Sequence, residues 1–387
     1  MKVYFDNAAT TPLAPEVLDA MLPYLSDHFG NPSSTHQFGR KAKAALETAR
    51  KKIASCLNCS PMEICFTSGG TEADNTAIRG SIMQLGVRHI ITAATEHHAV
   101  LHAAEACAEQ GLARLSFVNI DRDGHVDLEH LRSLLAEIED KCLVSLMHAN
   151  NEIGTMIKLE EVAEICAEAG ALFHSDTVQT MGHYPFDLSR TKVHFLTGAA
   201  HKFHGPKGVG FLFVNREVHL EPLIYGGSQE RKMRAGTENI YGIVGMARAL
   251  ELACEHMDEH RSHIEGLKAY AKERLRELLP DIRVNGCEER SLYTVLNVSL
   301  PKNEQAEMLL FLLDIDGIAV SSGSACSSGS NQGSHVLQAI SSADESQYGA
   351  SIRLSFSRYN RKEEIDYALE RLALHMNLTA KVENEED

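Results

Sequence analysis

Short apolar segments alternate with helical patterns between residues 60 and 215, and this alternation constrains the fold more than any other feature of the chain. The apolar segments are residues 89–92, 115–118, 143–147, 171–174 and 209–213. Apolar residues at helical spacing fill the intervals, for example between residues 159 and 169. This order predicts an α/β fold with a mostly parallel sheet and helices on both faces. Such sheets bind ligands at the carboxyl ends of their strands.

The pattern changes beyond a long helical stretch that we predict for residues 240–279. Residues 294–300 alternate like a half-buried strand, and residues 351–355 form a second predicted strand. Helices are expected near residues 304–313 and 362–376. This part of the chain reads as a smaller α+β domain, and we expect the ligand cleft to lie between the two lobes.

The composition narrows the class of protein. A formal net charge of -16 over 387 residues argues against nonspecific binding to nucleic acid or to an anionic membrane surface. No apolar run approaches the roughly 20 residues of a membrane-spanning helix, and residues 1–6 show no signal-peptide pattern. We therefore expect a cytoplasmic protein.

The nine cysteines are scattered and odd in number, which predicts reduced thiols rather than a disulfide framework. Cys56 and Cys59 have CxxC spacing without a second pair, so a zinc knuckle is not indicated, and a redox role stays open. His98 and His102 share a helical face, but no third ligand completes a metal motif there.

Lys202 follows the apolar run 193–196 and precedes a Gly-Pro-Lys-Gly turn at residues 205–208. A lysine that ends a strand can hold its amine at the mouth of a cleft and form a Schiff base with an aldehyde cofactor. The alternative is a solvated lysine on a loop.

Asp176 ends another predicted strand, where a carboxylate faces the ligand edge of the sheet and could hold a proton on a pyridine nitrogen. It could equally be a helix N-cap. His97, which also follows a strand, could stack on a planar cofactor or move protons, or be a core histidine. Asn150 and Asn151 follow the end of a further predicted strand, so their side-chain amides could also face the ligand. The alternative is that they form a plain Asx turn.

Residues 68–75 (SGGTEADN) precede a predicted helix, so their free N–H groups and the Thr71 hydroxyl could bind an anion, although an ordinary helix start explains them too. Nine small residues at 321–330 surround Cys326, which predicts a mobile loop with an exposed, reactive thiol. Arg353, on a predicted strand, could clamp a substrate carboxylate or form a structural ion pair.

Taken in order, these segments closely resemble the NifS/IscS-type cysteine desulfurases, which belong to the class V aminotransferase family of fold-type I pyridoxal-phosphate enzymes. The resemblance spans nearly the whole chain. The motifs that carry it are DNAATTP at residues 6–12, GNPS at 30–33, TSGGTE at 67–72, TEH at 95–97, NNEIG at 150–154, HK at 201–202, RAGT at 234–237 and SSGSAC at 321–326.

The resemblance implies two domains. Residues 15–260 would form the large domain that binds pyridoxal 5'-phosphate. Residues 1–14 and 261–387 would form the small domain, which carries the mobile cysteine loop at about residues 321–334.

The resemblance also implies residue roles around the cofactor. Lys202 would form the Schiff base, His97 would stack on the ring and move protons, and Asp176 would pair with the pyridinium nitrogen. Gln179 would donate to the ring oxygen, and Asn151 would contact both the cofactor and the substrate.

Other residues would bind the phosphate, the substrate and the sulfur. Gly70, Thr71 and His201 would bind the phosphate, and Thr237 would reach the phosphate of a neighbouring subunit, which makes a homodimer the expected assembly. Arg353, with Asn151, would hold the substrate carboxylate. Cys326 would take the sulfur.

The implied reaction converts L-cysteine to L-alanine and leaves a persulfide on Cys326. That sulfur would pass to an acceptor protein for iron-sulfur clusters or other sulfur-containing cofactors. Selenocysteine lysis and another aminotransferase-family activity are the alternatives, together with a non-catalytic relative.

Two departures from the family pattern stand out. The family usually has a serine three residues before the lysine, where this chain has Ala199. We therefore expect weaker cofactor retention unless Thr197 or a main-chain N–H compensates. The acidic segment 383–387 also differs from relatives that dock an iron-sulfur scaffold, which extend further and less acidically, so the resemblance does not extend to docking of such a scaffold.

Overall fold

Seven strands form the central sheet of the computed structural model, which describes residues 1–302, 308–322, 333–341 and 348–376. In spatial order the strands are β2 (Ile64–Thr67), β8 (Gly210–Val214), β7 (Phe195–Ala199), β6 (Leu172–Asp176), β5 (Cys142–Ser145), β3 (His89–Ala93) and β4 (Arg114–Val118). Strand β8 is antiparallel to both of its neighbours, and the other pairs are parallel. The predicted mostly parallel sheet is confirmed, and each of the five predicted strands coincides with a strand of this sheet.

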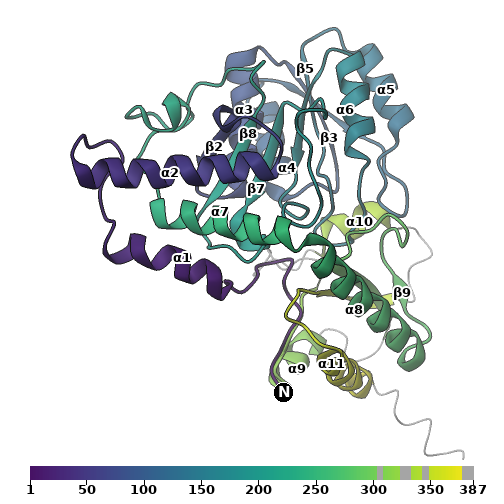
Figure 1. Cartoon of the computed structure of the whole chain (residues 1–387). Helices are drawn as coiled ribbons and strands as arrows, with labels where there is room; N and C mark the ends of the chain where they lie inside the picture. Colours follow the sequence, from purple (N-terminus) through teal and green to yellow (C-terminus); the bar gives the residue numbers. More distant parts are fainter. Residues whose placement is uncertain (303–307, 323–332, 342–347, 377–387) are drawn as a thin grey trace, which may run out of the picture.

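Helices cover both faces of the sheet (Figure 1). One face packs against α3 (Gly70–Leu85) and α4 (His98–Glu109). The other packs against α2 (Gln37–Cys56), α5 (Leu128–Glu137), α6 (Leu159–Glu168) and α7 (Ile240–Glu255), and α1 (Pro15–Ser26) lies against α7.

The two packed faces follow from the alternation of side chains along each strand. In β5, Leu143 joins the apolar cluster under α3 and α4, whereas Val144 joins the cluster on the opposite face. Leu172 and Phe173 divide in the same way in β6. Because each fully buried side chain of this size contributes about 1.5–3 kcal/mol, the two clusters fix the sheet and therefore the strand ends that carry the site.

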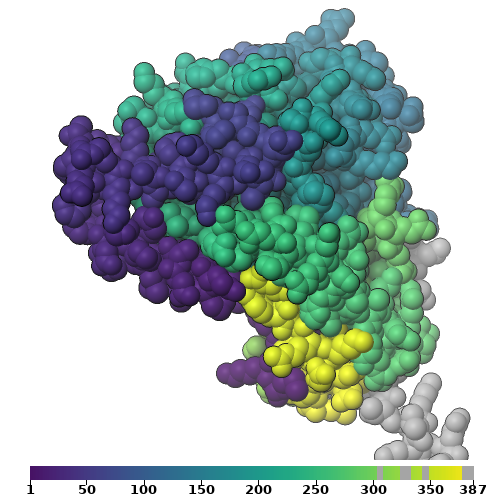
Figure 2. Space-filling view, viewed as in Figure 1, coloured from purple at the N-terminus to yellow at the C-terminus, as the bar shows by residue number. Residues whose placement is uncertain are grey.

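A second, three-stranded antiparallel sheet lies near the N-terminus. Its strands, in order, are β12 (Tyr348–Ser355), β10 (Val295–Pro301) and β9 (Arg283–Val284), and α8 (Met257–Leu278) and α11 (Lys362–His375) contribute to its core. The remaining named elements of this region are β1 (Val3–Tyr4), its parallel partner β11 (Ile318–Ala319), α9 (Leu309–Ile315) and α10 (His335–Ile340). Figure 2 shows the N-terminal residues, in purple, against the yellow residues near the end of the chain. The α/β class with a smaller α+β part is confirmed, and the exact domain boundaries stay a prediction.

The helical stretch predicted for residues 240–279 is present, but it is divided into two helices that meet at His256. Ile243 and Leu250 of α7 pack into the core of the large sheet, whereas Leu267 and Leu275 of α8 pack into the core of the small one. A single straight helix cannot bury its apolar face in both cores, so it breaks between them. Figure 1 shows the change of direction.

Smaller differences concern element ends. The helix expected near residues 304–313 is described from Leu309 to Ile315, and the strand expected at 351–355 begins at Tyr348. Among the described helices, none has both the length and the apolar composition needed to cross a lipid bilayer.

Candidate active site

A cavity of about 500 Å³ opens at the carboxyl ends of the large sheet, where the sequence predicted a ligand site. A volume of this size suits a cofactor together with a small substrate. The predicted site residues that line it are Gly70, Thr71, His97, Asn151, Asp176, Gln179, His201, Lys202 and Arg353.

Lys202 lies in a short 3-10 helix, η2 (Ala200–Lys202), that follows β7 directly. Its Nζ donates hydrogen bonds to the main-chain oxygens of Ala8, at 2.5 Å, and Ala9, at 2.9 Å. The amine is therefore held at the cavity wall by the N-terminal segment and does not lie on a solvated loop. Gln179 donates to the same Ala8 oxygen at 3.0 Å.

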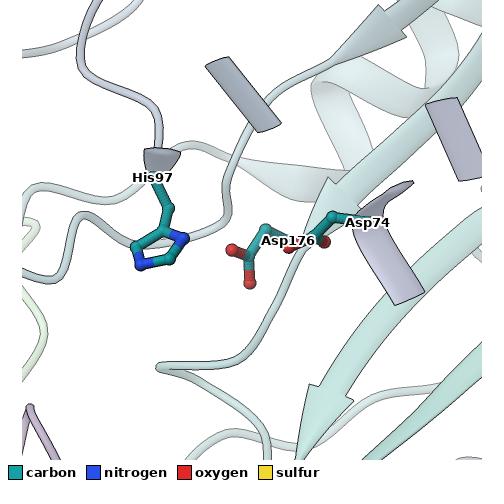
Figure 3. A group of neighbouring side chains, drawn as sticks. All are labelled: Asp74, His97 and Asp176. Carbon is teal, nitrogen blue, oxygen red and sulfur yellow. The ribbon is translucent and has the colours of Figure 1, made fainter. Parts of the chain in front are cut away.

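Two buried carboxylates and an imidazole meet in the cavity. One ligand atom from each of Asp74, His97 and Asp176 lies within 4.8 Å of the others. Figure 3 shows the His97 ring and the Asp176 carboxylate directed toward one another, with Asp74 beside Asp176. Asp176 also accepts from Val178 N at 2.8 Å, so its turn-capping role and its place in the cavity coexist.

Burial changes the proton affinities of this group. It raises the pKa of Asp176 to about 6, with a further rise from the nearby Asp74, and it raises the pKa of Asp74 itself to about 7. Burial lowers the pKa of His97, whose Nδ1 caps α4 by accepting from Ala99 N at 3.2 Å. The imidazole is therefore neutral near pH 7 and can accept a proton.

A carboxylate pair with one imidazole suits either a divalent metal ion or a protonated ring nitrogen. The Lys202 amine, which could form a Schiff base with an aldehyde, lines the same cavity. The arrangement therefore favours an aromatic aldehyde cofactor over a metal ion.

The opposite end of the site is the N-terminus of α3. The helix begins at Gly70, inside the segment 68–75 that was expected to precede it. A Cβ on Gly70 would lie 2.9 Å from Val178 Cγ2, so only glycine keeps the helix end this close to the cavity wall. Its free N–H groups, with the exposed Thr71 hydroxyl, form a site for an anion.

Ala199 lines the cavity beside this helix end, and a Cβ on Gly70 would be 3.7 Å from the Ala199 Cβ. The expectation that Thr197 replaces the missing hydroxyl is not supported. Thr197 is fully buried, its Oγ1 lies 3.2 Å from His174 Nε2, and it is not among the cavity-lining residues.

Arg353 is buried and already paired. It binds the Asp6 carboxylate through Nη2 and the Asn151 main-chain oxygen through Nη1, both at 2.9 Å. Its Nε has no hydrogen-bond partner among the described residues. The ion pair expected as one alternative is therefore present, and the guanidinium still faces the cavity. Asn150 forms the expected Asx turn by accepting from Glu152 N at 2.8 Å.

One predicted residue that the structure describes is not brought into the cavity, and another lies outside the described residues. Thr237 is exposed and is absent from its lining. Cys326 lies outside the described residues, as does most of the loop predicted at 321–334. The described residues that flank this gap do reach the site: Ser321 pairs with Arg353, and Gly333 and His335 line the cavity.

The residue-by-residue interpretation missed Asp6, Asp74 and Glu96. Asp74 had a usable signal, because it lies one helical turn after Gly70 and so faces the same side. Glu96 is buried and accepts from Met147 N at 2.8 Å, while its Oε2 has no partner among the described residues. Asp6 had no local signal, because its partner Arg353 is 347 positions away.

Comparisons with known proteins agree with this geometry. Residues 3–368 match the aminotransferase class-V family. The cysteine desulfurase IscS of Dictyoglomus turgidum is 44% identical over 371 residues, which cover 95% of this chain and 93% of that protein.

Two solved structures are similar over nearly their whole length. A NifS-like protein is 39% identical with a TM-score of 0.89, covering 97% of this chain and 100% of its own. SspA in complex with cysteine is 32% identical with a TM-score of 0.78, and the match covers 93% of this chain and 100% of SspA. The chain thus belongs to the class-V aminotransferase family, within which it groups with the IscS-type cysteine desulfurases.

Proposed function

We propose that this chain is a pyridoxal-phosphate-dependent cysteine desulfurase that converts L-cysteine to L-alanine. The observation that carries the proposal is that one cavity holds the Lys202 amine, the Asp176 carboxylate and the Arg353 guanidinium. These are the groups needed to anchor an aldehyde cofactor, to pair with its ring nitrogen and to bind an amino-acid carboxylate. Relatives that bear the name cysteine desulfurase support the choice of substrate.

The residues present fit pyridoxal phosphate. Members of this family generally use that cofactor. The N-terminus of α3 at Gly70 and Thr71, with His201, would hold the phosphate, and His97 and Asp176 would hold the ring. A Cβ on Gly70 would lie 2.9 Å from Val178 Cγ2, so the glycine leaves a cradle beside the helix N-terminus that suits a phosphate. When bound, the cofactor supplies the electron sink for the reaction.

The chain's own residues would then orient the substrate and move its protons. Arg353, whose plane is fixed by Asp6 and Asn151, would hold the substrate carboxylate. Neutral His97 would accept and return a proton within the cavity.

The sulfur would leave as a persulfide. The Cys326 thiolate attacks the substrate sulfur, the carbon–sulfur bond breaks, a sulfur–sulfur bond forms, and the carbon gains a proton to give alanine. This step balances without an external oxidant, because the carbon is reduced as the sulfur is oxidised. Cys326 would then pass the sulfur to an acceptor protein, which we propose serves iron-sulfur or other sulfur-cofactor synthesis.

We further propose a cytoplasmic homodimer in which Thr237 reaches the partner's cofactor phosphate. Apolar side chains exposed along α1 support a covered face: Leu18, Leu22 and Leu25 recur at helical spacing and are 44%, 49% and 52% exposed. Phe29 and Phe38 extend this face, with ring centroids 5.5 Å apart. The expected result in sedimentation is a dimer that Leu22→Glu dissociates.

The activity is tested by incubating the yellow holoenzyme with L-cysteine and a reductant and measuring both sulfide and alanine. We expect equal amounts of both products, with neither product from Lys202→Ala and no sulfide from Cys326→Ser. Full activity in Cys326→Ser would overturn the persulfide step. Mercaptopyruvate without sulfide would point to transamination, and pyruvate with sulfide in place of alanine would point to β-elimination. A large preference for selenocysteine over cysteine would identify a selenocysteine lyase.

A further inference from the structure

Two cysteines outside the active site meet at the ends of neighbouring helices. Cys56 is the last residue of α2, and Cys254 lies in the last turn of α7. These helices lie side by side in Figure 1 and pack against one another. The two thiols are close enough to change one another's proton affinity.

A second contact fixes the same helix ends. One turn before the thiols, Lys52 Nζ of α2 lies 2.9 Å from a Glu251 carboxylate oxygen of α7. Cys56 and Cys254 also pack against the same apolar cluster, on the face of the large sheet that α2 and α7 cover. The two sulfurs are therefore held together by the packing of the helices and not by a chance rotamer.

The backbone turns between Cys56 and Cys59, so Cys59 does not continue helix α2. Helix α2 ends at Cys56, Asn58 adopts a left-handed conformation with φ of 49°, and Cys59 N donates to Ala54 O at 3.0 Å. The CxxC spacing suggests a pair between Cys56 and Cys59. The structure instead gives Cys56 a partner 198 residues further along the chain.

Both thiols are accessible enough to react. Cys56 and Cys254 are partly exposed, whereas Cys65, Cys107 and Cys142 are buried. We propose that Cys56 and Cys254 form a redox modification site, in which a hydroperoxide converts the two thiols to a disulfide that links the ends of α2 and α7.

The chemistry balances with hydrogen peroxide as the oxidant. The neighbouring Cys56 thiol lowers the pKa of Cys254, whereas the pKa of Cys56 is raised, so Cys254 is the more readily formed thiolate. That thiolate attacks one peroxide oxygen, giving a sulfenic acid and hydroxide. The Cys56 sulfur then attacks the sulfenic sulfur, a sulfur–sulfur bond forms, and water leaves. Two thiols are oxidised and one peroxide is reduced to two waters.

The link would tie the two ends of the large-sheet region together. The residues between Cys56 and Cys254 include all seven strands of the large sheet, and Cys254 precedes the break at His256 where the chain passes to the small sheet. A cross-link that closes so long a loop restricts the unfolded chain, so the oxidised protein should unfold at a higher temperature.

The test treats the full-length holoenzyme with hydrogen peroxide, blocks the remaining thiols by alkylation and maps the peptides without reduction. We expect a Cys56–Cys254 cross-link, lighter than the two separate peptides by about 2 Da. It should form within one chain, keep monomer mobility in a non-reducing denaturing gel, and disappear with dithiothreitol. Cys59→Ser is the matched control, since it should keep the cross-link, whereas Cys56→Ser and Cys254→Ser should lose it.

The rise in thermal midpoint on oxidation provides a second measurement. We expect it in the wild-type protein and in Cys59→Ser, and not in Cys254→Ser. A Cys56–Cys59 link, a link between chains, or complete alkylation of Cys56 and Cys254 after peroxide treatment would each overturn the proposal. Circular dichroism of each variant establishes that it is folded before oxidation.

Discussion

The Arg353 guanidinium binds the Asp6 carboxylate at 2.9 Å, and the second amino group of Arg353 binds the Asn151 main-chain oxygen at the same distance. The group proposed to bind the substrate is thereby oriented before substrate arrives. A guanidinium held in one plane loses less conformational entropy when it binds a carboxylate.

Replacing Arg353 with lysine should raise the KM for cysteine about 10- to 100-fold, because lysine keeps the charge and loses the planar pair of donors. Steady-state kinetics measures the change. Arg276→Lys, on the exposed face of α8, is the control and should leave KM unchanged. An unaltered KM in a folded Arg353→Lys protein would remove Arg353 from the substrate site.

Ala199→Ser should slow the loss of cofactor on dialysis by about 10-fold or more, because a hydroxyl contact to a charged phosphate contributes roughly 1.5–3 kcal/mol. Residue 199 lies beside the N-terminus of α3, so the new hydroxyl would face the anion site. Absorbance of the retained cofactor gives the measurement. Ala200→Ser, one residue away and fully buried, is the comparison and should not slow release. Equal release rates for Ala199→Ser and wild type would contradict the prediction.

Glu230→Gln should reduce the free energy of unfolding by about 3–5 kcal/mol, because it removes the buried carboxylate that pairs with the buried Arg50 guanidinium and leaves only the half-exposed Glu47, at 3.5 Å, as a counter-charge. Arg50 and Glu230 are 1% and 5% exposed and share two hydrogen bonds of 2.7 and 2.8 Å. This pair also holds Glu230, Arg231 and Lys232 in left-handed conformations, with φ of 44°, 54° and 71°. Urea denaturation measures the loss.

The matched control for that change is Glu129→Gln. Glu129 lies 3.6 Å from Arg132, but its side chain is 88% exposed, so its loss should cost less than about 0.5 kcal/mol. Equal loss of unfolding free energy in the two variants would show that the contribution of the Arg50–Glu230 pair to stability does not depend on its burial.

Asp74→Asn should stabilise the cofactor-free protein more at pH 8 than at pH 5. Burial raises the pKa of Asp74 from 3.8 to about 7, so between these values the folded state binds a proton that the unfolded state has lost. Stability from this group therefore falls as the pH rises toward 7, by at most about 4 kcal/mol. Asparagine cannot ionise, so the variant does not lose this stability as the pH rises. Denaturation at both pH values, with exposed Asp19→Asn as control, provides the measurement. A benefit that is the same at pH 5 and pH 8 would contradict it.

Much of the fold was predictable because each strand of the large sheet that was predicted corresponds to a short apolar run in the sequence. Strands β3 to β6 appear as short apolar runs, and a polar residue that ends such a run, as Asp176 does, must lie at the ligand edge. Lys202 follows from the same reasoning. These predictions need only the period of the side chains and the direction of parallel strands.

Features that depend on distant contacts were not predictable. No glycine or proline marks the break at His256, because the cause is the presence of two cores and not a local signal. The contribution of Ala8 to the site is made by a main-chain oxygen, which no residue type reveals. The partner of Cys56 was likewise hidden, since the CxxC spacing pointed to Cys59.

The contacts from Ala8 to Lys202 and from Asp6 to Arg353 also determine the order in which parts of the site can form during synthesis of the chain. The large sheet can form once residue 214 has left the ribosome, but the cavity lacks one wall until residue 353 has emerged and folded back against Asp6. Completion of the site is therefore a late event in biogenesis, and a chain truncated before β12 would fold much of its large sheet without acquiring this wall.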